Sequence, residues 1–71
     1  MTITFKTLKS VNSNLNDNDV LNIIKEFDEN YYNSWLLYNK KINKLTKIDH
    51  FIIDLPVIFI DDLIKMLNNK N

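Results

Sequence analysis

Hydrophobic and polar residues alternate at the start of the chain, in the segment TITFKTL at residues 2–8. Ile3 and Phe5 fall on one face of an extended chain, and the polar residues between and after them fall on the other. Residues 50–54, HFIID, form a second short apolar run. We therefore expect strands at 2–8 and 50–54 that pair in a small sheet.

A helix is predicted over residues 17–30, after the polar loop segment SVNSNLNDN. Asn16 can cap its start, and Asp17 and Asp19 then lie in the first turn, where the helix dipole favours acidic side chains. The apolar positions that follow recur every three or four residues, at Val20, Ile24, Phe27 and Tyr31. This period is typical of a helix with one buried face.

A second helix is predicted over residues 31–47. Its apolar positions step by four, three, four and three residues, at Tyr31, Trp35, Tyr38, Ile42 and Leu45. We expect these side chains to form its core face. Asn30 is the predicted break between the two helices, because asparagine is the residue after glycine that best adopts the left-handed conformation of a helix end. A rival interpretation makes residues 34–39 a buried strand.

A third helix is predicted over residues 55–68, because Asp54-Leu55-Pro56 is typical of a helix start. Its expected core positions are Val57, Ile60, Leu63, Ile64 and Leu67. The sequence thus predicts a small, mostly helical α+β fold with a two-stranded sheet, in the order β-α-α-β-α. We expect this fold to form a single domain over residues 1–71. The alternative is an all-α three-helix domain.

Missing residue types exclude several kinds of chemistry. Glycine, arginine and cysteine are absent, and histidine occurs once, at His50. A glycine-rich phosphate loop, an arginine finger and the usual zinc sites are therefore excluded. We expect no enzyme activity, no catalytic residues, no cofactor and no metal. A small hydrolase centred on His50, with Asp49 or Asp54 as its partner, is an interpretation that no spacing supports.

Three apolar residues of the second helix have no place in its expected core stripe: Tyr32, Leu36 and Leu37. An exposed apolar patch usually marks a protein interface. We therefore predict that these residues bind a partner protein, or a second copy of the chain in a homodimer. The alternative is a wide core in which neighbouring segments cover them.

The lysines of the same region indicate a second class of function. Four of them lie close together, at Lys40, Lys41, Lys44 and Lys47. They could contact nucleic-acid phosphates. However, the expected helix places Tyr31, Trp35 and Tyr38 on its opposite side, away from where bases would have to stack. The formal net charge of zero also disfavours a protein that depends on phosphate contacts. Protein binding is the preferred prediction.

Composition refines this expectation. Isoleucine, lysine and asparagine are abundant while glycine, alanine and arginine are absent, which indicates a genome of very low GC content. No apolar run approaches the roughly 18 residues of a membrane span, so we expect no membrane partner and a cytoplasmic location. A small neutral chain of this kind suits an inhibitor encoded by a phage or plasmid, in an antitoxin, immunity or anti-defence role.

Overall fold

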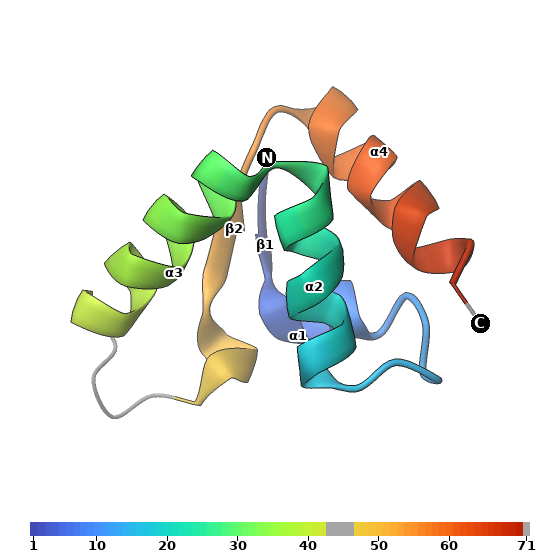
Figure 1. Cartoon of the computed structure of the whole chain (residues 1–71), viewed down its shortest axis with the longest axis horizontal. Helices are drawn as coiled ribbons and strands as arrows, with labels where there is room; N and C mark the ends of the chain where they lie inside the picture. Colours follow the sequence, from blue (N-terminus) through green and yellow to red (C-terminus); the bar gives the residue numbers. More distant parts are fainter. Residues whose placement is uncertain (43–46, 71) are drawn as a thin grey trace.

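The computed structural model describes residues 1–42 and 47–70, and it confirms a small α+β fold with a short two-stranded sheet (Figure 1). In chain order its elements are β1 (Thr2–Thr4), α1 (Phe5–Lys9), α2 (Asp17–Phe27), α3 (Glu29–Ile42), the 3-10 helix η1 (Ile48–His50), β2 (Ile52–Asp54) and α4 (Val57–Asn68). The helix α1 is additional to the expected order. Residues 34–39 lie within α3, so the rival strand is wrong.

The strands β1 and β2 pair antiparallel, with Ile3 opposite Ile53. The prediction of a strand over 2–8 is wrong beyond Thr4, where α1 begins. The Thr4 hydroxyl accepts a hydrogen bond from the Thr7 N–H at 3.2 Å and caps this helix. A strand would point Phe5 and Leu8 to opposite faces, whereas a helix brings both into the core, where they are fully buried.

The helix α2 starts as expected and ends earlier. Asn16 and Asp19 form a capping box, with the Asp19 N–H donating to Asn16 Oδ1 at 2.9 Å. The predicted left-handed break at Asn30 is wrong, because no described residue has a positive φ. The chain turns at Asp28 instead. Its backbone is extended, and its side chain accepts a hydrogen bond from the Tyr31 N–H at 3.0 Å.

The predicted ends of the other helices need smaller corrections. Lys47 has an extended backbone, so the helix predicted over 31–47 does not include it. The expected core position Leu45, like Lys44, lies outside the described residues. Asp54 ends β2 rather than capping a helix, and α4 begins after Pro56. The strand predicted over 50–54 starts at Ile52, because η1 occupies the preceding residues.

The core lies where α2, α4 and the sheet meet. Figure 1 shows α2 between α3 and α4, and α2 packs against both. The fully buried side chains include Val20 and Ile24 of α2, Ile53 of β2, and Ile60, Leu63 and Leu67 of α4. Phe5, Trp35 and Phe51 add an aromatic group, with ring centroids 6.3 Å and 5.9 Å from Trp35.

Polar side chains of α3 bind the outer edge of β2. The bonds between β1 and β2 leave the backbone groups of Ile52 pointing away from β1. Trp35 Nε1 donates to the Ile52 carbonyl oxygen at 2.8 Å, and the Ile52 N–H donates to Asn39 Oδ1 at 3.2 Å. Asn39 is only 2 % exposed, and its amide also donates to the Trp35 carbonyl oxygen at 2.8 Å. These bonds satisfy groups that would otherwise be costly to bury.

This attachment sets the rotation of α3 and overturns part of its expected core face: Trp35 is buried and Tyr31 packs against the core as predicted, but two later positions do not. Trp35 and Asn39 point to the sheet, and Tyr38 and Ile42 consequently face outward. The pattern of apolar residues missed this because Asn39 counts as a polar position. In the structure that asparagine is the more deeply buried residue, and Ile42 is exposed.

Candidate protein-binding surface

The structure separates the three residues predicted to bind a partner. Tyr32 and Leu36 are half-buried and pack against the core, and the Tyr32 ring centroid lies 6.2 Å from that of Trp35. Leu37 is 72 % exposed. The wide-core alternative therefore describes the packing of Tyr32 and Leu36, whereas Leu37 alone has the exposure expected of a binding residue.

Leu37 belongs to a larger exposed surface on the second half of α3. Tyr38 is 63 % exposed and Ile42 is 58 % exposed. Lys40 and Lys41 are exposed between them. We call these five residues, 37, 38 and 40–42, the α3 outer face. Residues three or four apart are neighbours on a helix, so Lys41 adjoins both Leu37 and Tyr38, and Ile42 adjoins Tyr38.

The α3 outer face also changes the geometry of the predicted lysine surface. Lys40 and Lys41 lie on α3, whereas Lys47 is exposed on the extended segment before η1. The four lysines therefore do not follow one helical stripe up to residue 47. In addition, Tyr38 lies on the same side as Lys41, so an aromatic ring and a basic group are exposed together.

A second exposed apolar surface lies at the start of α4. Val57 and Ile58 are exposed in its first turn, although Val57 was expected in the core. Asp61 and Asp62 are exposed one turn further along, three and four residues after Ile58. We call these four residues the α4 outer face. Its charge is opposite to that of the α3 outer face.

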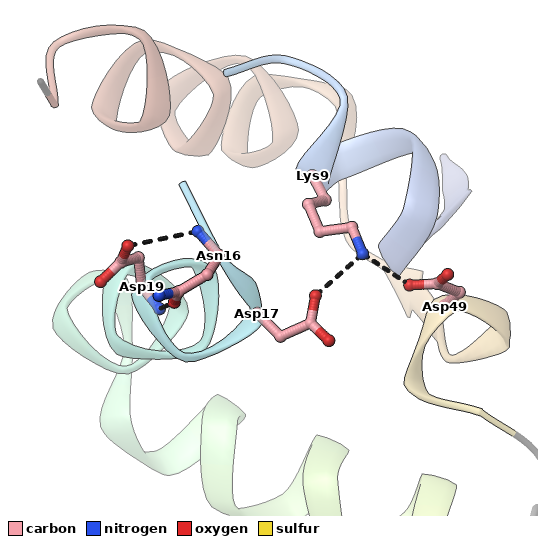
Figure 2. A network of polar contacts seen from close by, with 5 residues as sticks. All are labelled: Lys9, Asn16, Asp17, Asp19 and Asp49. Atoms are coloured by element: carbon pink, nitrogen blue, oxygen red, sulfur yellow. Dashed lines mark hydrogen bonds and ion pairs between the residues drawn. The ribbon is translucent and has the colours of Figure 1, made fainter. Parts of the chain in front are cut away.

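Figure 2 shows an ion-pair network that joins three distant segments. Lys9 Nζ lies 2.8 Å from Asp17 Oδ1 and 2.9 Å from Asp49 Oδ1. The hydrogen bond to Asp17 is the main cause that raises the pKa of Lys9, and the one to Asp49 adds to it. In turn, the hydrogen bond from Lys9 lowers the pKa of Asp49. The network links η1 to α1 and to the start of α2.

The same region offers little support for catalysis. Asp49 is bound to Lys9, and His50 is exposed on η1 with no hydrogen bond between the two side chains. Asp54 lies 4.0 Å from the N-terminal amino group. Within residues 1–42 and 47–70, no group of three or more histidine, cysteine or acidic side chains is placed to hold a metal ion.

A hollow of about 870 Å³ lies between the end of α1 and the start of α2, lined by Lys6, Lys9 and Asn16 among others. The N-terminus of a helix can bind anions. Here, however, the Asn16 side chain already accepts a hydrogen bond from the Asp19 N–H, and Asp17 and Asp19 place two negative charges in the first turn of α2 (Figure 2). The hollow is therefore not suited to a phosphate or carboxylate ligand.

No helix in the described part of the chain is long and apolar enough to cross a membrane. Comparison of the chain with protein-family models, with curated proteins and with solved structures finds no match. Function therefore has to be argued from the surfaces of the molecule itself.

Proposed function

We propose that the chain is a non-enzymatic protein-binding module that acts by occupying a partner's surface through the α3 outer face. One observation carries this proposal: Leu37, Tyr38 and Ile42 are largely exposed on the second half of α3, a helix whose opposite side is fixed to the sheet. Exposed apolar patches of this kind are typical of protein interfaces. Tyrosine is also among the residues that contribute most to binding energy.

The chemistry of this face indicates what the partner supplies. Burying one large apolar side chain contributes roughly 1.5–3 kcal/mol. Three of them give at most about 9 kcal/mol, because each is already partly buried, and the estimated cost of association itself is about 4–15 kcal/mol. The partner must therefore add complementary contacts. Lys40 and Lys41 favour an acidic rim around an apolar groove.

A differential capture experiment tests the proposal. Tagged natural chain and the triple variant Leu37→Ala, Tyr38→Ala, Ile42→Ala are exposed to lysates of candidate low-GC hosts. Alanine preserves the helix, because it has the highest helix propensity. The control is Ile52→Ala, which removes a half-exposed apolar side chain from β2, outside both outer faces.

We expect at least one protein to bind the natural chain and the Ile52→Ala control but not the triple variant. Thermal unfolding must show that all three chains are folded. If every captured protein binds the triple variant as well as the natural chain, the α3 outer face is not a protein-binding site.

A narrower form of the proposal is a cytoplasmic inhibitor encoded by a phage or plasmid, in an antitoxin, immunity or anti-defence role. The small size, the absence of cysteine and the low-GC composition support it. In this form the captured protein is a host or plasmid-encoded effector, and the bound chain blocks its active or assembly surface.

Nucleic-acid binding is the second candidate, because Tyr38 is exposed beside Lys41. Base stacking on an aromatic ring contributes about 1–3 kcal/mol, and lysines add salt-dependent phosphate contacts. On this hypothesis, a gel shift of single-stranded DNA or RNA at about 50 mM salt should disappear when Lys40, Lys41, Lys44 and Lys47 are changed to Glu. Absence of any shift by the natural chain would exclude this candidate.

A further inference from the structure

The two outer faces of the molecule are complementary in charge and alike in apolar character. The α3 outer face combines three apolar side chains with Lys40 and Lys41, and the α4 outer face combines Val57 and Ile58 with two aspartates. Lys65 follows one turn later on α4, so the acidic character is concentrated in the first half of that helix. Each face therefore combines exposed apolar side chains with charges opposite to those of the other face.

The positions of the two faces prevent them from meeting within one molecule. In Figure 1, α3 and α4 lie toward opposite ends of the longest axis, with α2 between them. The molecule extends 31 Å along that axis. A contact between the faces therefore requires two copies of the chain.

We infer that the partner of the α3 outer face is a second copy of this chain, bound through its α4 outer face in a head-to-tail arrangement. This inference rests on the binding site of the proposed function. A symmetric contact of α3 with α3 would bring lysines toward lysines, and one of α4 with α4 would bring aspartates toward aspartates. The head-to-tail contact instead places Lys40 and Lys41 opposite Asp61 and Asp62.

This arrangement has two physical consequences. A head-to-tail contact leaves one free face of each kind at the ends, so association continues beyond the dimer into rings or chains. The contact is also small and involves exposed charges, which salt screens. We therefore expect association that is weak, dependent on concentration, and stronger at low ionic strength.

Sedimentation velocity measures the association of the natural chain from about 10 µM to about 1 mM, the range of weak interfaces. The average mass should rise with concentration, and the rise should diminish as salt is added. Two charge-reversal variants then test the pairing, Lys40→Glu with Lys41→Glu and Asp61→Lys with Asp62→Lys. Each should weaken self-association by about tenfold or more, because like charges now meet across the contact.

Combining the two reversals provides the decisive result. A chain carrying all four substitutions again has opposite charges on its two faces, so its self-association should return to the natural strength. The matched control joins Lys40→Glu and Lys41→Glu to Glu26→Lys and Glu29→Lys. It has the same net charge as the fourfold reversal but no complementary α4 face, and it should stay dissociated.

Three results would overturn the inference: a natural chain that stays monomeric throughout the range, self-association that is insensitive to both reversals, or a fourfold reversal that recovers no more self-association than its control. The proposed function fails by a different result. If Leu37→Ala, Tyr38→Ala, Ile42→Ala leaves self-association intact and captures the same proteins as the natural chain, α3 is not the binding face. A monomeric chain that still captures a protein through α3 refutes only the inference.

Discussion

The helices α2 and α3 both have amphipathic sequences, but α3 buries only part of the core face that its pattern predicts, with Trp35 inside and later positions outside. Val20 and Ile24 of α2 are fully buried, whereas Tyr38 and Ile42 of α3 are exposed. The difference lies in what each helix packs against. The buried side of α2 meets apolar side chains of the core, and that of α3 meets the unpaired edge of a strand.

This comparison shows when apolar spacing determines the rotation of a helix. Against an apolar surface, the widest apolar stripe turns inward because burial of apolar area is the main favourable term. Against a strand edge, backbone groups without partners cost roughly 1–3 kcal/mol each. Hydrogen bonds from Trp35 and Asn39 then decide the rotation, and two apolar side chains remain in solvent as a result.

The largest expected effect contrasts one isoleucine from each helix. Ile24→Ala leaves a cavity in the core and should lower the free energy of unfolding by about 2–5 kcal/mol. Ile42→Ala removes an exposed side chain and should change it by less than about 0.5 kcal/mol. Chemical denaturation of both variants measures the difference. Equal losses would mean that the expected core face of α3 is its true one.

A medium effect is expected from the buried amide of α3. Asn39→Leu leaves the Ile52 N–H without its acceptor and should destabilise the fold by about 1–3 kcal/mol, although it adds apolar surface. The control Asn33→Leu places the same side chain at an exposed position of α3 and should have little effect. Denaturation midpoints report both changes. A neutral or stabilised Asn39→Leu variant would show that hydrogen bonding to β2 does not set the rotation.

Local signals in the sequence account for much of the fold. The α+β class, the two short strands, the Asn16 cap and the start of α2 could all be predicted, because the pattern of neighbouring residues indicates each element. The α1 helix could not, since the segment from Thr4 to Leu8 is rich in strand-forming residues. The spacing of Phe5 and Leu8 was the available signal: three residues apart, they share a face only on a helix.

The candidate site was less predictable because it depends on contacts between distant segments. Leu37 was predicted outside the core, and it is exposed. Tyr38 and Ile42 were assigned to the core because the spacing does not reveal that α3 would meet the edge of β2. The ion-pair network of Lys9 with Asp17 and Asp49 was equally hard to predict, since it joins separate segments of the chain that carry no shared motif.

That network yields the smallest expected effect, and it tests whether polar contacts position the α2 side of the fold as they position α3. Bonding to Lys9 lowers the pKa of Asp49, so its stabilisation is present above the ordinary value of 3.8 and is lost as pH falls through the lower folded value. The pKa of Lys9 is raised, so its stabilisation is present below 10.5 and is lost as pH rises through the higher folded value. Exposure and screening keep both effects small.

The variant Lys9→Met removes both contributions. Between about pH 5 and pH 2, its free energy of unfolding should therefore fall less steeply than that of the natural chain, and likewise above about pH 10.5. Lys25→Met, an exposed lysine of α2 outside the network, should keep the natural profile. Denaturation at a series of pH values provides the comparison. Identical profiles for all three chains would show that the start of α2 is positioned by its apolar contacts and cap alone, and that only α3 depends on long-range polar bonds.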